Sequence, residues 1–317
     1  LAKIIQVINE AAIEEETYRK NLIELSEILE AFDPSESPAF DFVFIDEAQD
    51  WPDLERDIIY RVFGPLRSVV ADGVDQLIRS SFPTDWTARI GNSPKQVVPL
   101  RKSLRLKNTL AKFANAFAEE LGLDSWSIQA NAEMSGGRVT IIIGPLVAAR
   151  PILSEIIGRF ASEGNLPVDS LVCVPYSTSS ELGSAAREVS EIIRESGFSI
   201  WDGTDKDERR SYATDTDQAR LVTYESCRGL EGWTVACMEL DKLFDQKFRH
   251  APEPEDLLTT KEDAARRYAG SWMMIPATRA IDHLVIHISN AEHELAGIFE
   301  KCLKDLGSDA GILVLRV

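Results

Sequence analysis

Blocks of apolar residues, separated by polar residues, divide the chain into segments of helix and strand length. In residues 1 to about 32, apolar positions recur every three or four residues, which predicts helix. The apolar run at 42–45 predicts a short strand buried on both faces, as in a parallel sheet. A helix is expected over residues 52–63, and a second short buried strand is expected over residues 68–71.

From residue 136 onward, strand and helix patterns alternate along the chain. Strands are expected over 138–143, 170–174, 198–201, 219–224, 234–240, 283–289 and 312–317. Helices are expected over 107–121, 148–160, 181–196 and from 266 onward. This alternation predicts an α/β fold with parallel sheets flanked by helices on both faces. The Gly-Asn-Ser-Pro sequence at 91–94 is typical of a linker, so we expect two domains, residues 1–93 and 94–317.

The composition is that of a protein with two ordinary hydrophobic cores. The chain has 317 residues, of which 44% are hydrophobic, and no apolar stretch reaches membrane-spanning length. None of the four cysteines has the spacing of metal ligands, and Cys173 and Cys237 lie in apolar runs typical of buried positions. We therefore expect a cytoplasmic protein. The net charge of −18 argues against a broad basic nucleic-acid surface, but it leaves room for a narrow channel lined with arginine and lysine.

Polar side chains follow both short strands of the first expected domain. Asp46 and Glu47 follow the first strand directly, and Gln76 lies a few residues beyond the second. Parallel strands deliver the residues at their carboxyl ends to the crevice where ligands bind, so these groups are candidates for one site. Asp46 would hold Mg²⁺ and Glu47 would polarise a water for attack on a phosphate. The alternative is an acidic surface loop after a core strand.

The densest basic cluster of the chain precedes the helix expected over 107–121. It consists of Arg101, Lys102, Arg105 and Lys107. Contact with a phosphate is one use for such a cluster, and the solvated start of a helix is the other.

Five short segments occur in the order that is known from one family of motor proteins. They are DEAQD at 46–50, VADGVDQ at 70–76, LRKSLR at 100–105, LVTYESCRGLE at 221–231 and PATRA at 276–280. Each falls at a strand end or loop of the expected fold, as the chemistry of the family requires. Over residues 41 to about 290, the chain resembles superfamily 1 helicases of the UvrD/Rep type.

The resemblance implies two RecA-like lobes with ATP and Mg²⁺ between them, of which this chain supplies part of the first and all of the second. Asp46 would ligate Mg²⁺, and Glu47 would activate the attacking water. The other implied residues are Gln76, Arg105 and Arg279 at the γ-phosphate, Gly229 and Glu231 at the ribose, and Thr223 and Ser226 at the backbone of a nucleic-acid strand. The implied partner is single-stranded nucleic acid, with DNA favoured over RNA.

Several positions depart from the family pattern. The phosphate-cradling Gly-Lys-Ser/Thr loop is absent, and we expect it upstream of Leu1, in a longer chain of which this is a piece. Glu225 and Arg228 stand where the family has a histidine and a lysine, and Met274 stands where it has a tyrosine. The large accessory insertion that usually precedes Thr223 has no room here.

These departures leave three interpretations open. The favoured one is a fragment of an ATP-dependent helicase or translocase, inactive by itself. The second is a catalytically inert RecA-like scaffold that binds a protein partner, and the third is a magnesium-dependent hydrolase centred on Asp46. For His283 and His287 a structural role is favoured over metal binding, and for Phe82 and Trp86 core packing is favoured over base stacking.

Overall fold

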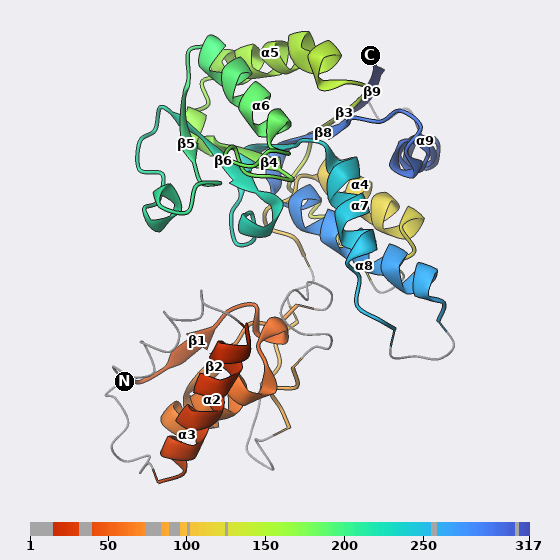
Figure 1. The fold of residues 1–317 in the computed structure, drawn as a ribbon. Coiled ribbons are helices and arrows are strands. Elements are labelled where there is room, and N and C mark those ends of the chain that lie inside the picture. The colour runs from red at the N-terminus through yellow and green to blue at the C-terminus, as the bar shows by residue number, and fades with distance from the viewer. Residues whose placement is uncertain are drawn as a thin grey trace. The chain divides into compact units, whose positions relative to one another are not determined.

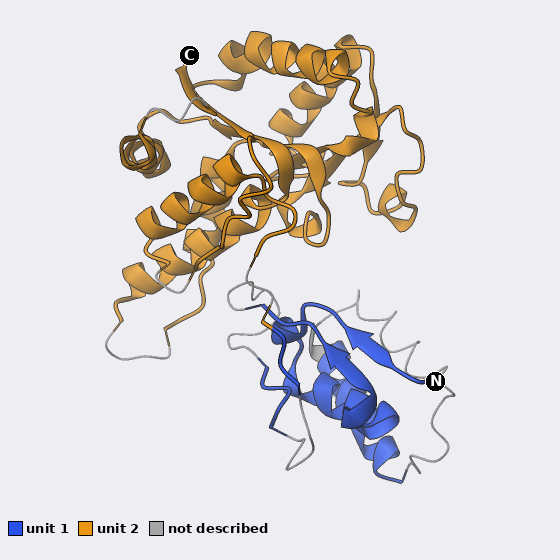
Figure 2. Ribbon diagram, turned by 180° about the vertical axis from the view of Figure 1, so that it is seen from behind, with its two compact units in different colours: residues 1–98 blue, residues 99–317 orange. Residues whose placement is uncertain are grey.

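The chain forms two compact units, Leu1–Val98 and Pro99–Val317 (Figure 2). The computed structural model describes residues 15–31, 40–73, 84–88, 96–99, 102–123, 126–254, 259–307 and 311–317. Gln76, Phe82, Arg101 and the expected linker at 91–94 lie outside these residues, as does the first part of the helix expected over 1–32. Each unit has its own hydrophobic core.

The first unit is a small α/β layer. Its elements are α2 (Glu15–Glu30), β1 (Val43–Ile45), the 3₁₀ turn η2 (Ala48–Asp50), α3 (Asp53–Phe63), η3 (Pro65–Arg67) and β2 (Ser68–Val70) (Figure 1). The strands β1 and β2 pair in parallel. Helix α2 packs on α3 through Leu22, Leu25 and Leu29. Helix α3, together with Trp86, covers the face of the sheet that carries Ile45.

The expectation that the first strand is buried on both faces is wrong for the described residues. Phe44 is 77% exposed, whereas Ile45 is buried against Ala48 and Trp86. Successive side chains of a strand point to opposite faces, so Phe44 and its cross-strand neighbour Val69 turn away from α3. The described part of this unit therefore covers its two-stranded sheet on one face.

The second unit is built on a seven-stranded parallel sheet with the strand order β5-β6-β4-β7-β8-β3-β9. The strands are β3 (Arg138–Ile143), β4 (Ser170–Val174), β5 (Ser199–Asp202), β6 (Gln218–Thr223), β7 (Gly232–Cys237), β8 (Ala280–Ile288) and β9 (Ile312–Arg316). The helices are α4 (Asn108–Glu120), α5 (Leu146–Ser162), α6 (Ser184–Glu195), α7 (Leu240–Arg249), α8 (Lys261–Ala277) and α9 (Glu294–Leu306). Helices α5 and α6 cover one face, and α4, α7 and α8 cover the other (Figure 1). The predicted α/β class, with a parallel sheet flanked by helices, is confirmed.

The central strands read as almost continuous apolar runs because helices cover both of their faces. In β3, the five residues after Arg138 are all buried. On the face opposite α5 and α6, helices α4 and α9 join through three aromatic rings. Phe113, Phe117 and Phe299 lie with their ring centroids 4.9 to 6.1 Å apart. These contacts hold α4 and α9 together.

Two helices of the second unit differ from the sequence prediction. The strand expected over 234–240 ends at Cys237, and α7 begins at Leu240. Glu239 separates the two elements with a left-handed backbone, φ 50°. The sequence pattern does not predict this turn, because the residues on both sides of it are apolar. Helix α9 occupies a stretch for which the pattern predicts no element.

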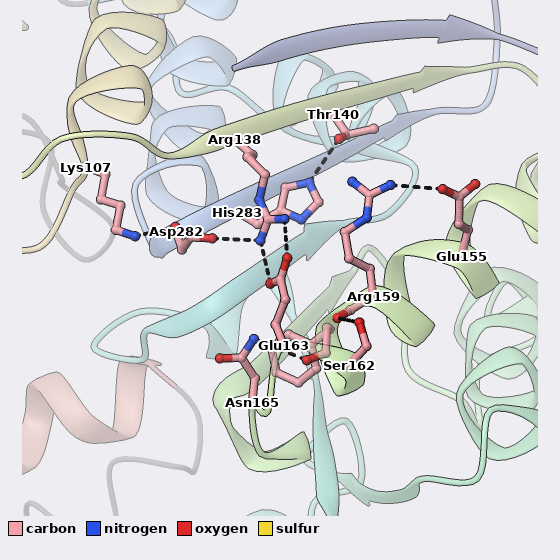
Figure 3. A network of polar contacts seen from close by, with 11 residues as sticks. Lys107, Arg138, Thr140, Glu155, Arg159, Ser162, Glu163, Asn165, Asp282 and His283 are labelled. Carbon is pink, nitrogen blue, oxygen red and sulfur yellow. Dashed lines mark hydrogen bonds and ion pairs between the residues drawn. The ribbon is translucent and has the colours of Figure 1, made fainter. Parts of the chain in front are cut away.

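A network of ion pairs and hydrogen bonds lies at the amino ends of β3 and β8 (Figure 3). Arg138 donates two hydrogen bonds to Glu163, at 2.7 and 2.9 Å, and one to Asp282 at 2.9 Å. Lys107, just before α4, pairs with the other oxygen of Asp282. Although burial alone raises the pKa of Asp282, its bonds to Lys107 and Arg138 outweigh burial and lower that pKa. The network ties α4, both strands and the end of α5 together.

Candidate functional site

Strand β1 delivers two carboxylates at its carboxyl end. Glu47 has a left-handed backbone, φ 50° and ψ 40°, and caps the start of η2. Its backbone N–H donates to Asp46 Oδ1 over 2.9 Å. The left-handed conformation costs a non-glycine residue about 1–2 kcal/mol, so the fold holds Glu47 there against its local preference. Strained residues of this kind gather at functional sites.

Gln49 fixes the Glu47 carboxylate in place. Its side chain is 2% exposed, and its Nε2 donates to Glu47 Oε2 over 2.8 Å. Its Oε1 accepts the backbone N–H of Gly73 over 2.8 Å, so the tip of β1 is fastened to the segment after β2. Sequence reasoning assigned Gln49 no role. The available signal was an amide two residues after a carboxylate, since a buried amide needs partners for both of its ends.

Asp46 has the chemistry to hold a divalent cation. It is exposed, and among the described residues only the Glu47 N–H occupies its carboxylate oxygens. Mg²⁺ is usually held by one or two carboxylates together with waters and phosphate oxygens, so one free carboxylate oxygen fits this ion. The described residues contain no cluster of three or more His, Cys, Asp or Glu that would form a complete protein site.

Three residues predicted at the nucleotide gather at one edge of the second unit. Arg105 Nη1 lies 3.6 Å from Glu231 Oε2. The backbone N–H of Gly232 donates to the carbonyl oxygen of Arg279 over 3.1 Å. Arg220 adds a hydrogen bond of 2.6 Å from Nη2 to the carbonyl oxygen of Glu231. These contacts place the side chains of Arg105 and Glu231 and the backbone of Arg279 together at the amino ends of β7 and β8.

The side chain of Arg279 lies inside the second unit. The residue is 4% exposed, and its Nε donates to the carbonyl oxygen of Ile275, near the end of α8, over 3.1 Å. The side chain of Arg105 is 33% exposed. Arg105 is therefore the more accessible of the two predicted arginine fingers, and Arg279 would have to rotate outward to reach an external phosphate.

Thr223 and Ser226 lie at the other end of the parallel strands, where β6 ends. Their hydroxyl oxygens are 3.1 Å apart, and Arg209 Nη1 donates to Ser226 Oγ over 2.5 Å. Gly229 follows with φ 74°, a conformation that glycine adopts without strain, and leads into Glu231. The loop at 224–231 therefore runs from the carboxyl ends of the strands, where Thr223 and Ser226 lie, to the amino end of β7, beside Arg105.

Other candidates from the sequence are held in the core. Trp86 is buried and donates from Nε1 to the carbonyl oxygen of Ala48 over 2.7 Å, as favoured over base stacking. Cys173 and Cys237 are buried free thiols, as predicted. Burial raises the pKa of the Cys237 thiol well above its usual range, which makes it unreactive. His287 is buried, with Nε2 2.9 Å from the carbonyl oxygen of Gly144.

Comparisons with known proteins add little to this geometry. No protein-family model matches the chain, and no curated protein matches it. Among solved structures, the chain is similar to the C-terminal domain of a possible DNA helicase from Lactobacillus plantarum WCFS1, at 9% sequence identity and a TM-score of 0.35. The match covers 67% of this chain and 99% of that one. A likeness of this strength carries no argument about function.

None of the described helices combines the length and the apolar character that crossing a bilayer requires.

Proposed function

We propose that this chain is part of an ATP-dependent nucleic-acid helicase or translocase of the UvrD/Rep type. The observation that carries the proposal is the Arg105–Glu231 ion pair beside Arg279. These residues come from three separate sequence segments that resemble nucleotide-contacting motifs, and the fold brings them to one edge of the second unit. Motif matches that arose by chance would have no reason to converge in this way.

In this proposal the two units supply complementary groups. Asp46 would hold Mg²⁺, which neutralises phosphate charge. Glu47 would accept the proton of the attacking water, and the hydrogen bond from Gln49 would orient the Glu47 carboxylate. Arg105 and Arg279 would stabilise the charge on the transferred phosphoryl group, because arginine is always charged and binds oxygens in a bidentate manner. The phosphate-cradling loop would come from a segment upstream of this chain.

The proposed nucleic-acid contacts lie at the carboxyl end of β6. Thr223 and Ser226 would contact the backbone of a single strand, because serine and threonine hydroxyls are common donors to phosphate. The loop at 224–231 continues from these hydroxyls to Glu231 at the nucleotide edge. Binding of the strand and binding of the nucleotide would then be coupled through one short loop.

An inert scaffold that binds a protein partner is the second candidate, and the burial of Arg279 favours it. The accessible carboxylate of Asp46 and the Gln49-oriented carboxylate of Glu47 favour the motor. A magnesium-dependent hydrolase without a motor would leave the placement of Arg105 unexplained.

The test is ATP hydrolysis by the full-length native protein, measured with and without single-stranded DNA. We expect the strand to stimulate hydrolysis, and we expect Glu47→Gln to abolish turnover while ATP binding stays intact. Glu24→Gln, on the exposed side of α2, is the matched control and should behave as wild type. Unchanged turnover in Glu47→Gln would eliminate the assigned base, and a wild-type protein that does not bind ATP would favour the scaffold.

A further inference from the structure

The loop between β5 and β6 carries an exposed aromatic ring close to the proposed strand-contacting hydroxyls. Tyr212 follows the short turn η5 (Glu208–Arg210) and is 86% exposed. Arg209 of the same loop donates from Nη1 to Ser226 Oγ over 2.5 Å. This contact joins the loop to the carboxyl end of β6, where Thr223 also lies. Strands β5 and β6 are parallel neighbours in the sheet, so the loop that follows β5 and the loop that follows β6 both begin at the carboxyl ends of the strands (Figure 1).

The loop has an internal structure that fixes its course. Asp205 accepts the backbone N–H groups of Asp207 at 2.8 Å and Glu208 at 3.1 Å. The bonds from Glu208 and Asp207 lower the pKa of the Asp205 carboxyl. At the start of the loop, Asp202 Oδ2 accepts a hydrogen bond of 2.7 Å from Thr178 Oγ1. A side chain presented by a structured loop loses less conformational freedom when a ligand binds.

The guanidinium of Arg209 contacts a serine hydroxyl. Among the described residues no carboxylate pairs with it, whereas its neighbour Arg210 pairs with Asp207 at 3.5 Å. A guanidinium beside serine and threonine hydroxyls is the set of groups that proteins use to contact phosphate.

The surroundings of Tyr212 favour a nucleic-acid partner over a protein partner. The residues at 205–211 before the ring are all charged or polar, so the ring is not part of the kind of contiguous apolar patch that marks many protein interfaces. A single exposed ring on the same short loop as an arginine matches the pattern of strand-binding surfaces, in which bases stack on rings and cations contact the phosphates.

We propose that Tyr212 stacks on a base, and that Arg209 binds a neighbouring phosphate, of a single nucleic-acid strand that passes over Thr223 and Ser226. The inference rests on the proposed function and adds the β5–β6 loop to its strand-binding surface. Stacking tolerates any sequence, because every base has a flat π face.

The test is fluorescence anisotropy with the full-length native protein and its variants Tyr212→Ala, Tyr212→Phe and Arg209→Ala. The labelled ligands are a thymidine 12-mer and a 12-mer in which every base is replaced by an abasic site. Tyr212→Ala should weaken binding of the thymidine strand roughly tenfold and leave abasic binding unchanged, because only the base contact is lost. Tyr212→Phe should restore binding. Arg209→Ala should weaken both ligands and lower the slope of log affinity against log salt by about 0.7. Arg159→Ala, an exposed arginine on α5, is the control and should change neither ligand.

Failure of the inference and failure of the proposed function give different results. If wild type binds the thymidine strand and Tyr212→Ala binds it equally well, the stacking role is overturned while the proposed function stands. If Tyr212→Ala weakens thymidine and abasic binding to the same extent, the ring does not stack on a base and the inference is again overturned. If wild type binds neither strand at low salt, both the strand-binding function and the inference are overturned.

Discussion

Gln49 Nε2 donates a hydrogen bond to Glu47 Oε2 over 2.8 Å, and this contact directs the carboxylate that the proposed mechanism uses as a base. The other end of the same amide accepts the backbone N–H of Gly73. One buried side chain therefore connects the candidate base to the segment that follows the neighbouring strand.

The second unit repeats this arrangement where β7 ends. Glu239 has φ 50°, as Glu47 does, and the two are the non-glycine residues of the described chain with positive φ. Asp241, two residues after Glu239, accepts the backbone N–H groups of Ser289 and Asn290 beyond the neighbouring strand β8, each over 3.0 Å. In both units, a strained glutamate is followed by a buried side chain that fastens the next loop.

If Gln49 orients the base, Gln49→Leu should lower ATP turnover of the full-length protein by up to about a hundredfold with little change in KM, because a catalytic group displaced by about 1 Å loses that much. Gln129→Leu changes an exposed glutamine of the second unit and is the control. Turnover equal to wild type in Gln49→Leu, with the fold intact by circular dichroism, would remove Gln49 from the mechanism.

Asp241 should contribute more to stability than its neighbours on α7. It is buried and accepts two backbone N–H groups and the Ser289 hydroxyl, the last over 2.6 Å. Asp241→Ala leaves those donors without a partner and should lower the free energy of unfolding of the second unit by about 3 kcal/mol or more. Asp245→Ala, at an exposed site on the same helix, should cost less than about 1 kcal/mol. Similar urea midpoints for the two variants would contradict this assignment.

The pH dependence of stability should reveal the buried His283. Burial, followed by the nearby charge of Arg138, lowers the pKa of His283 to about 4. The same group in the unfolded chain has a pKa of about 6.5, so the unfolded state takes up the proton first. Stability therefore falls as the pH drops from about 6.5 to about 4, by roughly 3 kcal/mol for this group alone.

Urea unfolding at a series of pH values measures this effect. Burial also lowers the pKa of His287, which adds to the loss in the same direction. Asp282 and Glu163 have lowered pKa values, so their stabilisation is fully present above about pH 5 and is lost progressively below it, which leaves the upper part of the window to the histidines. His283→Gln should reduce the slope of stability against pH, and the exposed His250→Gln should not. An unchanged slope in His283→Gln would contradict the assigned pKa.

The fold of the second unit is predicted well where the sequence contains long apolar runs. The strands expected over 138–143 and 170–174 agree with β3 and β4 at both ends, because helices on both faces require continuous apolar strands. The end of β7 is missed because Met238 and Leu240 continue the apolar run through the turn at Glu239. That turn is imposed by tertiary contacts, which local composition does not encode.

The candidate site is predictable only in part. The motifs place Arg105, Glu231 and Arg279 on separate segments. Glu231 and Arg279 come together because they precede the neighbouring strands β7 and β8, and the ion pair with Glu231 adds Arg105. The burial of Arg279 depends on packing against α8, which the motif does not contain. The exposure of Tyr212 likewise depends on the course of one loop.

The central claim is that the carboxylates of the first unit and the arginines of the second act on one ATP molecule. Its most direct test is strand-stimulated ATP hydrolysis by the full-length protein carrying Arg279→Ala, with the exposed Arg267→Ala on α8 as the control. The claim predicts a fall in turnover of about a thousandfold for Arg279→Ala and activity near wild type for the control. A loss of less than about tenfold in a correctly folded Arg279→Ala protein would contradict it, since an arginine finger contributes far more than that.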